Sequence, residues 1–507
     1  MSAAEPEACA LSSSSLDVKE KCQYYGNSSS DPPTEPHPDM DMFCCHSVQD
    51  SLLSSDSRFT NYRGILNWII ILLVSHSLWI LNVILLNVIK FYTLCREREE
   101  TNIVVFCVLF FQILTHAHLF LDNFIQHGFL IDLRKVLEHL MEDHYNWPSV
   151  NLILAANMFA IAALLLERCL DKGTLSPSAG HCLHLGNLGL LTLFPAVIIL
   201  YDTSISTGGA YFSLWTYTVL GLKLYSYQET NSWYRQGSVP SPGTDKCVLH
   251  ETKKHIEHLP IKDLYYFLLA PTLCYQRNFP FTPRVRINVL CKTLIEMVVL
   301  TQIIVGVVQQ WIEPIFQRSE NSFSNMDITT RVEHLMELVA PNHFLWLMFS
   351  FLFSHSYLNF CAELLCFGDR HFYGDWWNAK TLKCFWGNWN IPLHKWRYRH
   401  LYTPLLKKRV SQKQADLLVF LMSAALCEYV IALPLHSCRL WIFFMMIFEL
   451  LVDVYLGDYF KGNYGNGLVW LCFLLGPPLA MMTYFHDHYM SHHGQHPPGL
   501  SVAECLS

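Results

Sequence analysis

Long apolar runs separated by shorter polar connections are the dominant pattern along the chain. Residues 64–89 form the clearest run, which ends at the charged segment CREREE (95–100). About 20 apolar residues in a helix cross the hydrocarbon core of a bilayer, which is about 30 Å thick. The pattern predicts nine or ten membrane-spanning segments, one or two of them re-entrant or half-spanning. The further candidates are 103–125, 149–168, 184–201, 208–228, 289–312, 342–366, 415–435, 437–457 and 467–485.

The composition supports a membrane protein. Only 15% of the 507 residues are charged and 52% are hydrophobic, whereas soluble domains carry about 25% charged residues. A disordered chain, a collagen-like chain and an ordinary cytosolic enzyme are therefore excluded. We expect an all-α, polytopic membrane protein whose helical body covers residues 61–490.

The two ends of the chain have a different composition. Residues 1–60 are rich in Ser, contain DPPTEPHP (31–38), and carry ten acidic against three basic residues. This predicts a disordered acidic tail that accounts for the net charge of −7, because such a segment buries too little apolar surface to fold. The remaining chain is neutral and offers no basic field for nucleic acid. Residues 491–507 are predicted to be a polar C-terminal tail.

Cysteine and histidine usage argues against disulfide and metal frameworks. The eighteen cysteines are scattered and no CxxC occurs, so most are expected to pack as small hydrophobic side chains. The His-rich segment 486–496 lacks the Cys or acid cluster that would complete a metal site. The polar N-terminus shows no cleavable signal peptide, so the first spanning helix is expected to direct membrane insertion.

The loop 367–410 combines basic and aromatic residues. Six Lys or Arg and no acid lie between His394 and Arg409, so the positive-inside rule places the loop in the cytosol. One interpretation is a topology-setting loop with an interfacial aromatic belt. The other is a binding site for coenzyme A, an anionic nucleotide that needs cations and ring faces.

Within this loop, residues 372–378 read FYGDWWN. The segment resembles the FYxDWWN motif of the sterol and diacylglycerol acyltransferase branch of the membrane-bound O-acyltransferase family. The wording NFPFTPRVR is nearer to the diacylglycerol enzymes than to the sterol enzymes. The resemblance covers roughly residues 60–490, and its further stretches are PTLCYQRNFPFTPRVR (271–286), VVQQWIEP (307–314), APNHFLWL (340–347), WNIPLHKWRYRHLY (389–402) and GNYGN (462–466).

The resemblance implies an acyl-CoA-dependent O-acyltransferase of the endoplasmic reticulum membrane. It implies about nine transmembrane helices around an intramembrane chamber, a cytosolic N-terminal tail, and a homodimer or homotetramer. Acyl-CoA is the donor, and the acceptor is a lipid alcohol within the membrane. Diacylglycerol, giving triacylglycerol, is the first expectation; sterol, retinol and wax alcohols stay open. The family needs no metal or other cofactor.

The resemblance also implies roles for particular residues. Asn390 stands at the position of the family's catalytic asparagine and is expected to contact the thioester carbonyl. The residues expected to bind acyl-CoA are Phe372, Tyr373, Asp375, Trp376, Trp377, Asn378, Trp389, His394, Lys395, Arg399, Tyr402 and Ser423.

The sequence departs from the family at the catalytic helix. The family carries His-Glu-Tyr there, acting through the histidine as general base, and this chain carries Cys427-Glu428-Tyr429. A thiol is a poor base near neutral pH, but it is a nucleophile when activated. Three interpretations stay open: a pseudoenzyme that binds acyl-CoA or pairs with an active paralogue, an enzyme with altered chemistry, or an altered form of an ordinary enzyme.

Three further positions are expected at the chamber. His355 matches a family helix, and ionisable residues inside spans are usually functional. Glu449 and Pro477 stand where the branch usually has Gln. A Cys427 nucleophile would need a base to activate it. Glu449 and Asp453, four residues apart, are the acids that could act as this base if they face the chamber.

Overall fold

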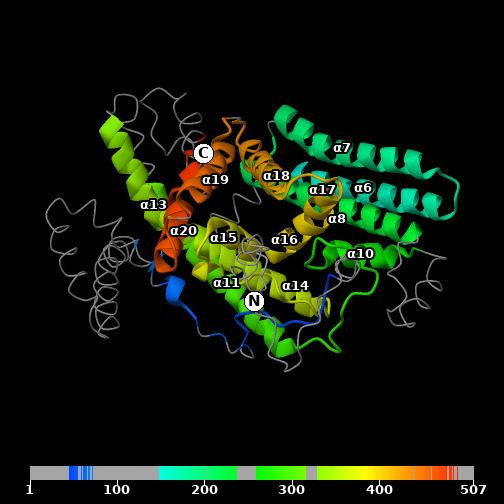
Figure 1. Ribbon diagram of the computed structural model, residues 1–507, viewed down its shortest axis with the longest axis horizontal. Helices are drawn as coiled ribbons and strands as arrows, with labels where there is room; N and C mark the ends of the chain where they lie inside the picture. The colour runs from blue at the N-terminus through cyan, green and yellow to red at the C-terminus, as the bar shows by residue number, and fades with distance from the viewer. Residues whose placement is uncertain are drawn as a thin grey trace, which may run out of the picture.

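The computed structural model describes about two thirds of the chain and is helical there (Figure 1). Only two isolated bridges, and no β-sheet, occur among the described residues. These residues are 45–54, 57, 59, 61–65, 67–68, 71, 148–202, 204–236, 259–315, 328–437, 439–457, 459–476, 479–481, 483–484 and 488.

The long helices coincide with the predicted apolar runs. They are α6 (Pro148–Asp171), α7 (Pro177–Tyr201), α8 (Thr207–Arg235), α11 (Ile287–Val307), α13 (Ile328–Phe351), α18 (Gln412–Ala432), α19 (Trp441–Leu456) and α20 (Asn463–Leu475). Six helical stretches of the described chain are long and apolar enough to cross a membrane. The expectation of an all-α, multi-span membrane protein is thus confirmed. The predicted runs 64–89 and 103–125 lie mostly or wholly outside the described residues.

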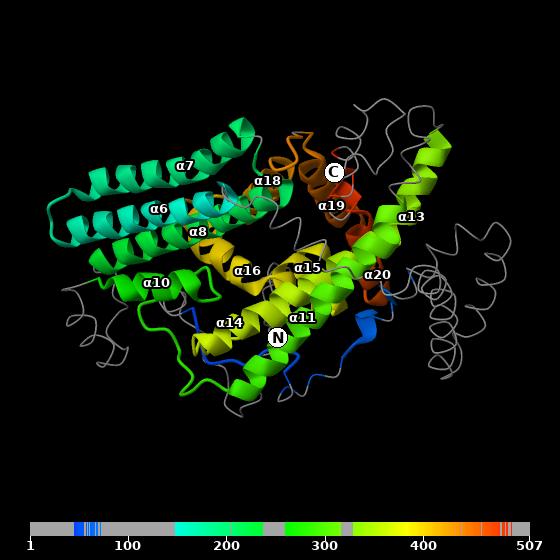
Figure 2. The same cartoon turned by 180° about the vertical axis from the view of Figure 1, so that it is seen from behind.

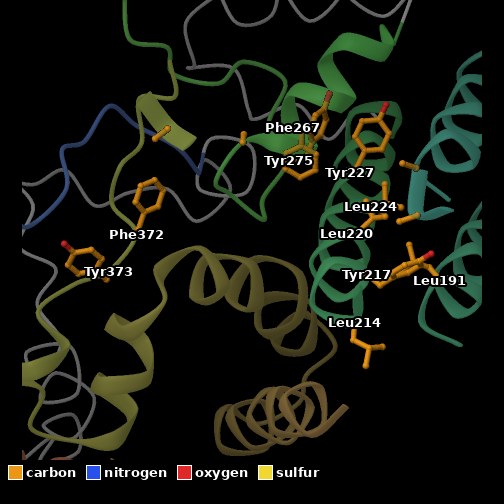
Figure 3. Packing of buried hydrophobic residues seen from close by; sticks show 14 of the residues in the cluster. Leu191, Leu214, Tyr217, Leu220, Leu224, Tyr227, Phe267, Tyr275, Phe372 and Tyr373 are labelled. Atoms are coloured by element: carbon orange, nitrogen blue, oxygen red, sulfur yellow. The ribbon is translucent and has the colours of Figure 1, made fainter. Parts of the chain in front are cut away.

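α6, α7 and α8 form one group of packed helices (Figure 1). Every third or fourth side chain of α8 is buried, which places Leu214, Tyr217 and Leu224 in the core. Figure 3 shows Tyr217 of α8 beside Leu191 of α7. The Tyr217 hydroxyl donates a hydrogen bond to the Leu152 carbonyl at 2.8 Å, so the one polar atom of this aromatic ring is satisfied.

A second group contains α11, α13 and α20. α13 continues through a π-helical turn, η4 (Leu352–Tyr357), into α14 (Leu358–Leu364), and η4 packs against α11. α11 ends in a similar turn, η2 (Val308–Ile312). π-Turns inside helices often occur at functional positions, and η4 contains His355.

The loop 367–410 lies between the two groups (Figure 2). It folds into short helices rather than an extended connection, and α10 (Ile261–Leu269) covers the ends of α6 and α8 beside it. The short elements of the loop are η5 (Trp376–Asn378), α15 (Leu382–Trp389), α16 (Ile391–Arg397), η6 (Tyr398–Tyr402) and α17 (Thr403–Lys407).

Part of the predicted N-terminal tail, residues 1–60, contacts the helical body. Residues 1–44 lie outside the described chain, but residues 45–54, called the N-terminal segment below, pack on the body. The amide of Gln49 donates to the Gly368 carbonyl at 3.1 Å, and the amide of Arg370 donates to the Gln49 carbonyl at 2.9 Å. Backbone pairing with a distant loop orders this polar segment, and composition alone does not reveal such pairing.

Candidate functional site

Asn390 occupies the junction between α15 and α16. Its Oδ1 accepts a hydrogen bond from the Leu393 amide at 3.0 Å, and Pro392 follows at the second helical position. Asn is among the best N-cap residues, and Pro is favourable in the first turn. Because the side-chain oxygen is used as the cap, a contact with a thioester carbonyl would fall to the Nδ2 donors.

The FYxDWWN motif is held by segments far away in the chain. The side-chain Nδ2 of Asn378 donates to the Asn61 carbonyl at 2.7 Å, and the Oδ1 of Asn378 accepts from the backbone amide of Gly64 at 2.8 Å. Asn466 donates to the carbonyls of Trp377 and Ala379 at 2.9 and 2.8 Å. This explains the GNYGN stretch as a structural partner of the motif.

Four tryptophans of the loop, Trp376, Trp377, Trp386 and Trp389, pack into one aromatic cluster, whereas Trp396 contacts Tyr225 and His400. The ring centroid of Trp389 lies 4.6 Å from those of Trp376 and Trp346. Trp377 is 5% exposed, and its indole nitrogen donates to the Asn61 carbonyl at 3.2 Å. These rings therefore form the packed interior of the loop. Their contact with coenzyme A stays a prediction. The buried side chains of Phe372 and Tyr373 belong to the same core.

The cations of the loop fall into two sets. Lys395 is bound to Asp369 at 2.8 Å, and Arg399 is buried and donates to the Tyr275 carbonyl at 2.8 Å. Burial, with the nearby Arg397 and Lys383, lowers the pKa of His394 to about 4, so this side chain is neutral at pH 7. Lys407, Lys408 and Arg409, at the end of α17 and after it, are exposed. Tyr402 is half-buried and stacks on Tyr398.

Cys427 lies on α18 with an exposed side chain, one turn after the buried Ser423. Ser423 accepts a hydrogen bond from Arg397 Nη1 at 3.2 Å, and Arg397 also donates to the Trp386 carbonyl at 3.4 Å. Arg397 thus joins the loop to α18. The sequence predicted it only as one cation among six, because contacts across separated helices leave no local pattern.

Glu428 faces away from the position of Cys427. Its two carboxylate oxygens accept from the Tyr484 hydroxyl and from the Phe443 amide. Tyr484 in turn accepts from the Trp441 amide at 3.0 Å. Glu428 therefore caps the start of α19, where Leu440 supplies no side-chain cap.

The two acids of α19 both bind α15. Glu449 is buried, and its Oε2 accepts from the Trp386 indole at 3.3 Å. Asp453 accepts from the Leu382 amide at 3.2 Å, at the N-terminus of α15, where negative charge is favourable. These two contacts orient the loop against α19. Pro477 lies outside the described residues.

His355 joins the spans to the loop. Its Nδ1 shares a 2.7 Å hydrogen bond with the Tyr373 hydroxyl. Asn359, one turn later, donates to the His355 carbonyl at 2.7 Å and to Ser51 of the N-terminal segment at 3.3 Å. Ser51 is a site neighbour that the sequence assigned to the tail.

The N-terminal segment also carries an ionic cluster. His46 Nδ1 lies 2.7 Å from Asp369 Oδ2. Burial alone would lower the pKa of His46, but the negative charge of Cys45 and the hydrogen bond with Asp369 raise it to about 9. A hydrogen bond from the Cys274 thiol, with the charges of His46 and Arg399, lowers the pKa of Cys45 well below its usual range against the effect of burial. Both shifts favour a thiolate on Cys45 beside an imidazolium on His46.

This pair predicts a stability plateau. Between about pH 6.5 and 9 the folded Cys45–His46 pair holds one proton, on His46, and the unfolded pair also holds one, on Cys45. The contribution of the pair to the free energy of unfolding is therefore constant in this window. Below this window the unfolded state binds more protons than the folded state, so the contribution to stability falls as the pH drops. Near pH 9 the unfolded Cys45 thiol and the folded His46 imidazolium lose their protons over the same range. We expect the unfolding temperature of the wild type to exceed that of a Cys45→Ser/His46→Gln variant by about 2–4 °C inside the window. A difference that stays constant from pH 5 to pH 10 would contradict this protonation scheme.

The fold is that of a polytopic membrane protein, because several long apolar helices surround a loop of short helices. Its polar site lies where this loop meets the spanning helices. A family model described as "MBOAT, membrane-bound O-acyltransferase family" matches residues 174–486. The chain belongs to the membrane-bound O-acyltransferase family and is an acyltransferase.

Three relatives show how far the similarity extends. Diacylglycerol O-acyltransferase 1 of Homo sapiens is 41% identical over 450 residues, which cover 88% of this chain and 84% of the relative. The Bos taurus protein of the same name is 40% identical over 454 residues, covering 88% and 85%. Diacylglycerol O-acyltransferase 1B of Glycine max is 33% identical over 377 residues, covering 73% and 74%.

Proposed function

We propose that this acyltransferase moves a fatty acyl group from acyl-CoA to the hydroxyl of diacylglycerol, giving triacylglycerol and free CoA. The observation that carries the proposal is the similarity over 88% of the chain to a relative named diacylglycerol O-acyltransferase 1. Cleavage of a thioester with formation of an ester changes no oxidation state, so the two substrates supply the reacting groups. We infer an endoplasmic reticulum location and a homodimer or homotetramer from the family.

The chemistry proposed for the site is direct attack of the lipid hydroxyl on the thioester carbon. The Nδ2 donors of Asn390 would bind the carbonyl oxygen as negative charge develops on it, and the C–S bond then breaks. The hydroxyl proton ends on the CoA sulfur. Arg397 positions the loop against α18, and the exposed Lys408 and Arg409 would bind the anionic part of CoA.

Cys427 supports a second candidate, an acyl-CoA-binding pseudoenzyme. A thiol occupies the position of the family's base, and both carboxylate oxygens of Glu428 are used by Tyr484 and Phe443. Neither residue is then set up to accept the hydroxyl proton. This candidate predicts affinity for acyl-CoA without turnover.

One assay separates the candidates. Purified full-length protein is supplied with labelled oleoyl-CoA and, in parallel, with diolein, cholesterol, retinol or hexadecanol. The proposed function predicts labelled triolein above the level given by Cys427→Ala, and more product with diolein than with the other acceptors. Preference for another alcohol overturns the proposed acceptor. Binding of oleoyl-CoA with no labelled product from any acceptor supports the pseudoenzyme instead.

A further inference from the structure

The imidazole ring of His400 is bound to α8 through both of its nitrogens. His400 lies in η6 and is 2% exposed. Its Nδ1 lies 2.9 Å from Glu229 Oε2, and its Nε2 lies 2.8 Å from Ser226 Oγ. Ser226 and Glu229 are three residues apart, so they share one face of α8. These two hydrogen bonds, called the His400 contact below, join the loop 367–410 to a long helix.

The donors and acceptors of the His400 contact have one consistent direction. An ionised Glu229 carboxylate only accepts, so the hydrogen of the neutral ring is assigned to Nδ1 and Nε2 is an acceptor. Ser226 then donates its hydroxyl hydrogen to Nε2, while its oxygen accepts from the Tyr275 amide at 2.8 Å. A protonated His400 would turn a second donor toward Ser226 and break this chain of three hydrogen bonds.

Aromatic side chains fix the plane of the same ring. Trp233 of α8 stacks on His400 with an interplanar angle of 15° and ring centroids 5.5 Å apart. Tyr225 of α8 meets the ring edge-on, at 85° and 5.8 Å. Trp396, one turn earlier in the loop, lies 5.6 Å from His400, and its indole donates to the Leu222 carbonyl of α8 at 2.8 Å. α8 therefore determines both the position and the rotation of the imidazole.

The His400 contact reaches the candidate site through one continuous helical stretch. α16, η6 and α17 follow one another without a break from residue 391 to residue 407, and Asn390 caps the start. Arg397, three residues before His400, donates to Ser423 of α18 at 3.2 Å. The 391–407 stretch is thus held on α8 by His400 and on α18 by Arg397. Ten residues of helix, about 15 Å, separate His400 from Asn390.

We propose that His400 is a positioning residue of the acyl transfer, whose neutral ring, held by Ser226 and Glu229, sets the orientation of the helical stretch that begins at Asn390. The effect on turnover rests on the proposed function, whereas the effect on the 391–407 stretch does not. A misplacement of about 1 Å at the reacting atoms costs up to about 10²-fold in rate. Loss of the His400 contact therefore lowers the rate without removing a group that touches a substrate.

Acid should weaken the His400 contact. The groups that face the ring are Glu229 and Tyr225 of α8, Arg399 of η6 and Cys45 of the N-terminal segment. Burial lowers the pKa of His400 from its ordinary value, against the opposing effect of the hydrogen bond with Glu229. The neutral ring therefore contributes its full stabilisation above about pH 6.5, the ordinary pKa of an unfolded histidine. The contribution declines as the pH falls below that value.

The first test measures the His400 contact without catalysis. Hydrogen exchange of residues 391–402 is followed by mass spectrometry in full-length wild type, His400→Phe and His400→Gln. His400→Phe keeps a ring on Trp233 and loses both hydrogen bonds, so exchange should quicken about tenfold or more. His400→Gln keeps a neutral amide that can accept from Ser226 and should stay within about threefold of wild type. From pH 7 to pH 5, after correction for the intrinsic rate, exchange should quicken in the wild type and not in His400→Gln.

The second test measures turnover and carries a matched control. With oleoyl-CoA and diolein, His400→Phe should lower kcat about 10- to 100-fold, and His400→Gln should restore it to within about threefold. His184 of α7 is 3% exposed and lies 2.9 Å from Glu167, so it is another buried histidine beside an acid. His184→Phe should lower the unfolding temperature while leaving kcat and the exchange of residues 391–402 at the wild-type level.

The two tests fail in different ways. Exchange of residues 391–402 that is the same in His400→Phe and wild type, or equally fast in His184→Phe and His400→Phe, overturns the proposal. Faster exchange in His400→Phe with an unchanged kcat also overturns it, because the stretch would then move without consequence for the reaction. If neither wild type nor Cys427→His gives labelled triolein, the proposed function fails, and the exchange result alone upholds or overturns the His400 contact.

Discussion

Replacing Cys427 by histidine should raise the rate of transfer to diacylglycerol by about 10²- to 10⁴-fold, the usual contribution of a positioned general base. An imidazole titrates near neutral pH and accepts the hydroxyl proton as the oxygen attacks. The side chain at this position is exposed rather than packed, so the larger ring has room. The measurement is kcat for labelled triolein formation by wild type, Cys427→His and Cys427→Ala.

A position-specific control accompanies this comparison. Cys182→His places the same substitution on α7, where the cysteine is also exposed, and should leave the rate at the wild-type level. A wild type already as fast as Cys427→His, combined with a fatty acyl group on Cys427 in the mass spectrum, would show a thiol nucleophile in place of a missing base. The rate gain would then be absent because the acyl group passes through the sulfur.

Replacing Asn390 by aspartate should lower kcat by about 10²- to 10³-fold, the usual cost of removing one donor to a developing oxyanion. Aspartate caps a helix as well as asparagine does, so α16 should keep its start and the protein its unfolding temperature. Only the Nδ2 donors are lost, and a negative charge replaces them near the carbonyl. Activity, thermal unfolding and acyl-CoA affinity are measured on the same preparations.

Two comparisons isolate the donor from the cap. Asn390→Ala removes both the Nδ2 donors and the Oδ1 cap. It should lower the free energy of unfolding by about 1 kcal/mol and also lower the activity. Asn388→Asp, two residues earlier, makes the same chemical change at a neighbouring side chain and should retain most activity. Equal activity of Asn390→Asp and wild type would remove Asn390 from the oxyanion role and leave it as the α16 cap.

The sequence predicted the spanning helices well because length and hydropathy are local properties. α6, α7 and α18 all overlap their predicted runs. α8 extends to Arg235, beyond the predicted end at residue 228, because its polar last turns are buried; Thr230 and Asn231 are 0% and 1% exposed. Hydropathy stops at the first polar residues and misses such an extension.

The sequence predicted which residues belong to the site better than it predicted which residues they contact. The family motif identified the loop, but the partners of that motif, Asn61, Gly64 and Asn466, are about 90 to more than 300 residues away. The direction in which each acidic side chain points could likewise be known only from the three-dimensional structure. Glu449 and Asp453 were the acids expected to serve Cys427 if they faced it, and the structure shows them bound to the Trp386 indole and the Leu382 amide. Helix rotation, which decides this, depends on packing with neighbours that the sequence does not specify locally.

The junction around Asn378 has a consequence for how the protein is made. It is closed by Asn61 near the start of the chain, by the motif in the middle, and by Asn466 near the end. A Cβ on Gly64 or Gly465 would lie 1.6 or 2.5 Å from a carbonyl oxygen of that junction, so both approaches are tight. A nascent chain lacking α20 holds the loop without one of its three supports. The ribosome must therefore finish nearly the whole polypeptide before the loop 367–410 can adopt its final conformation.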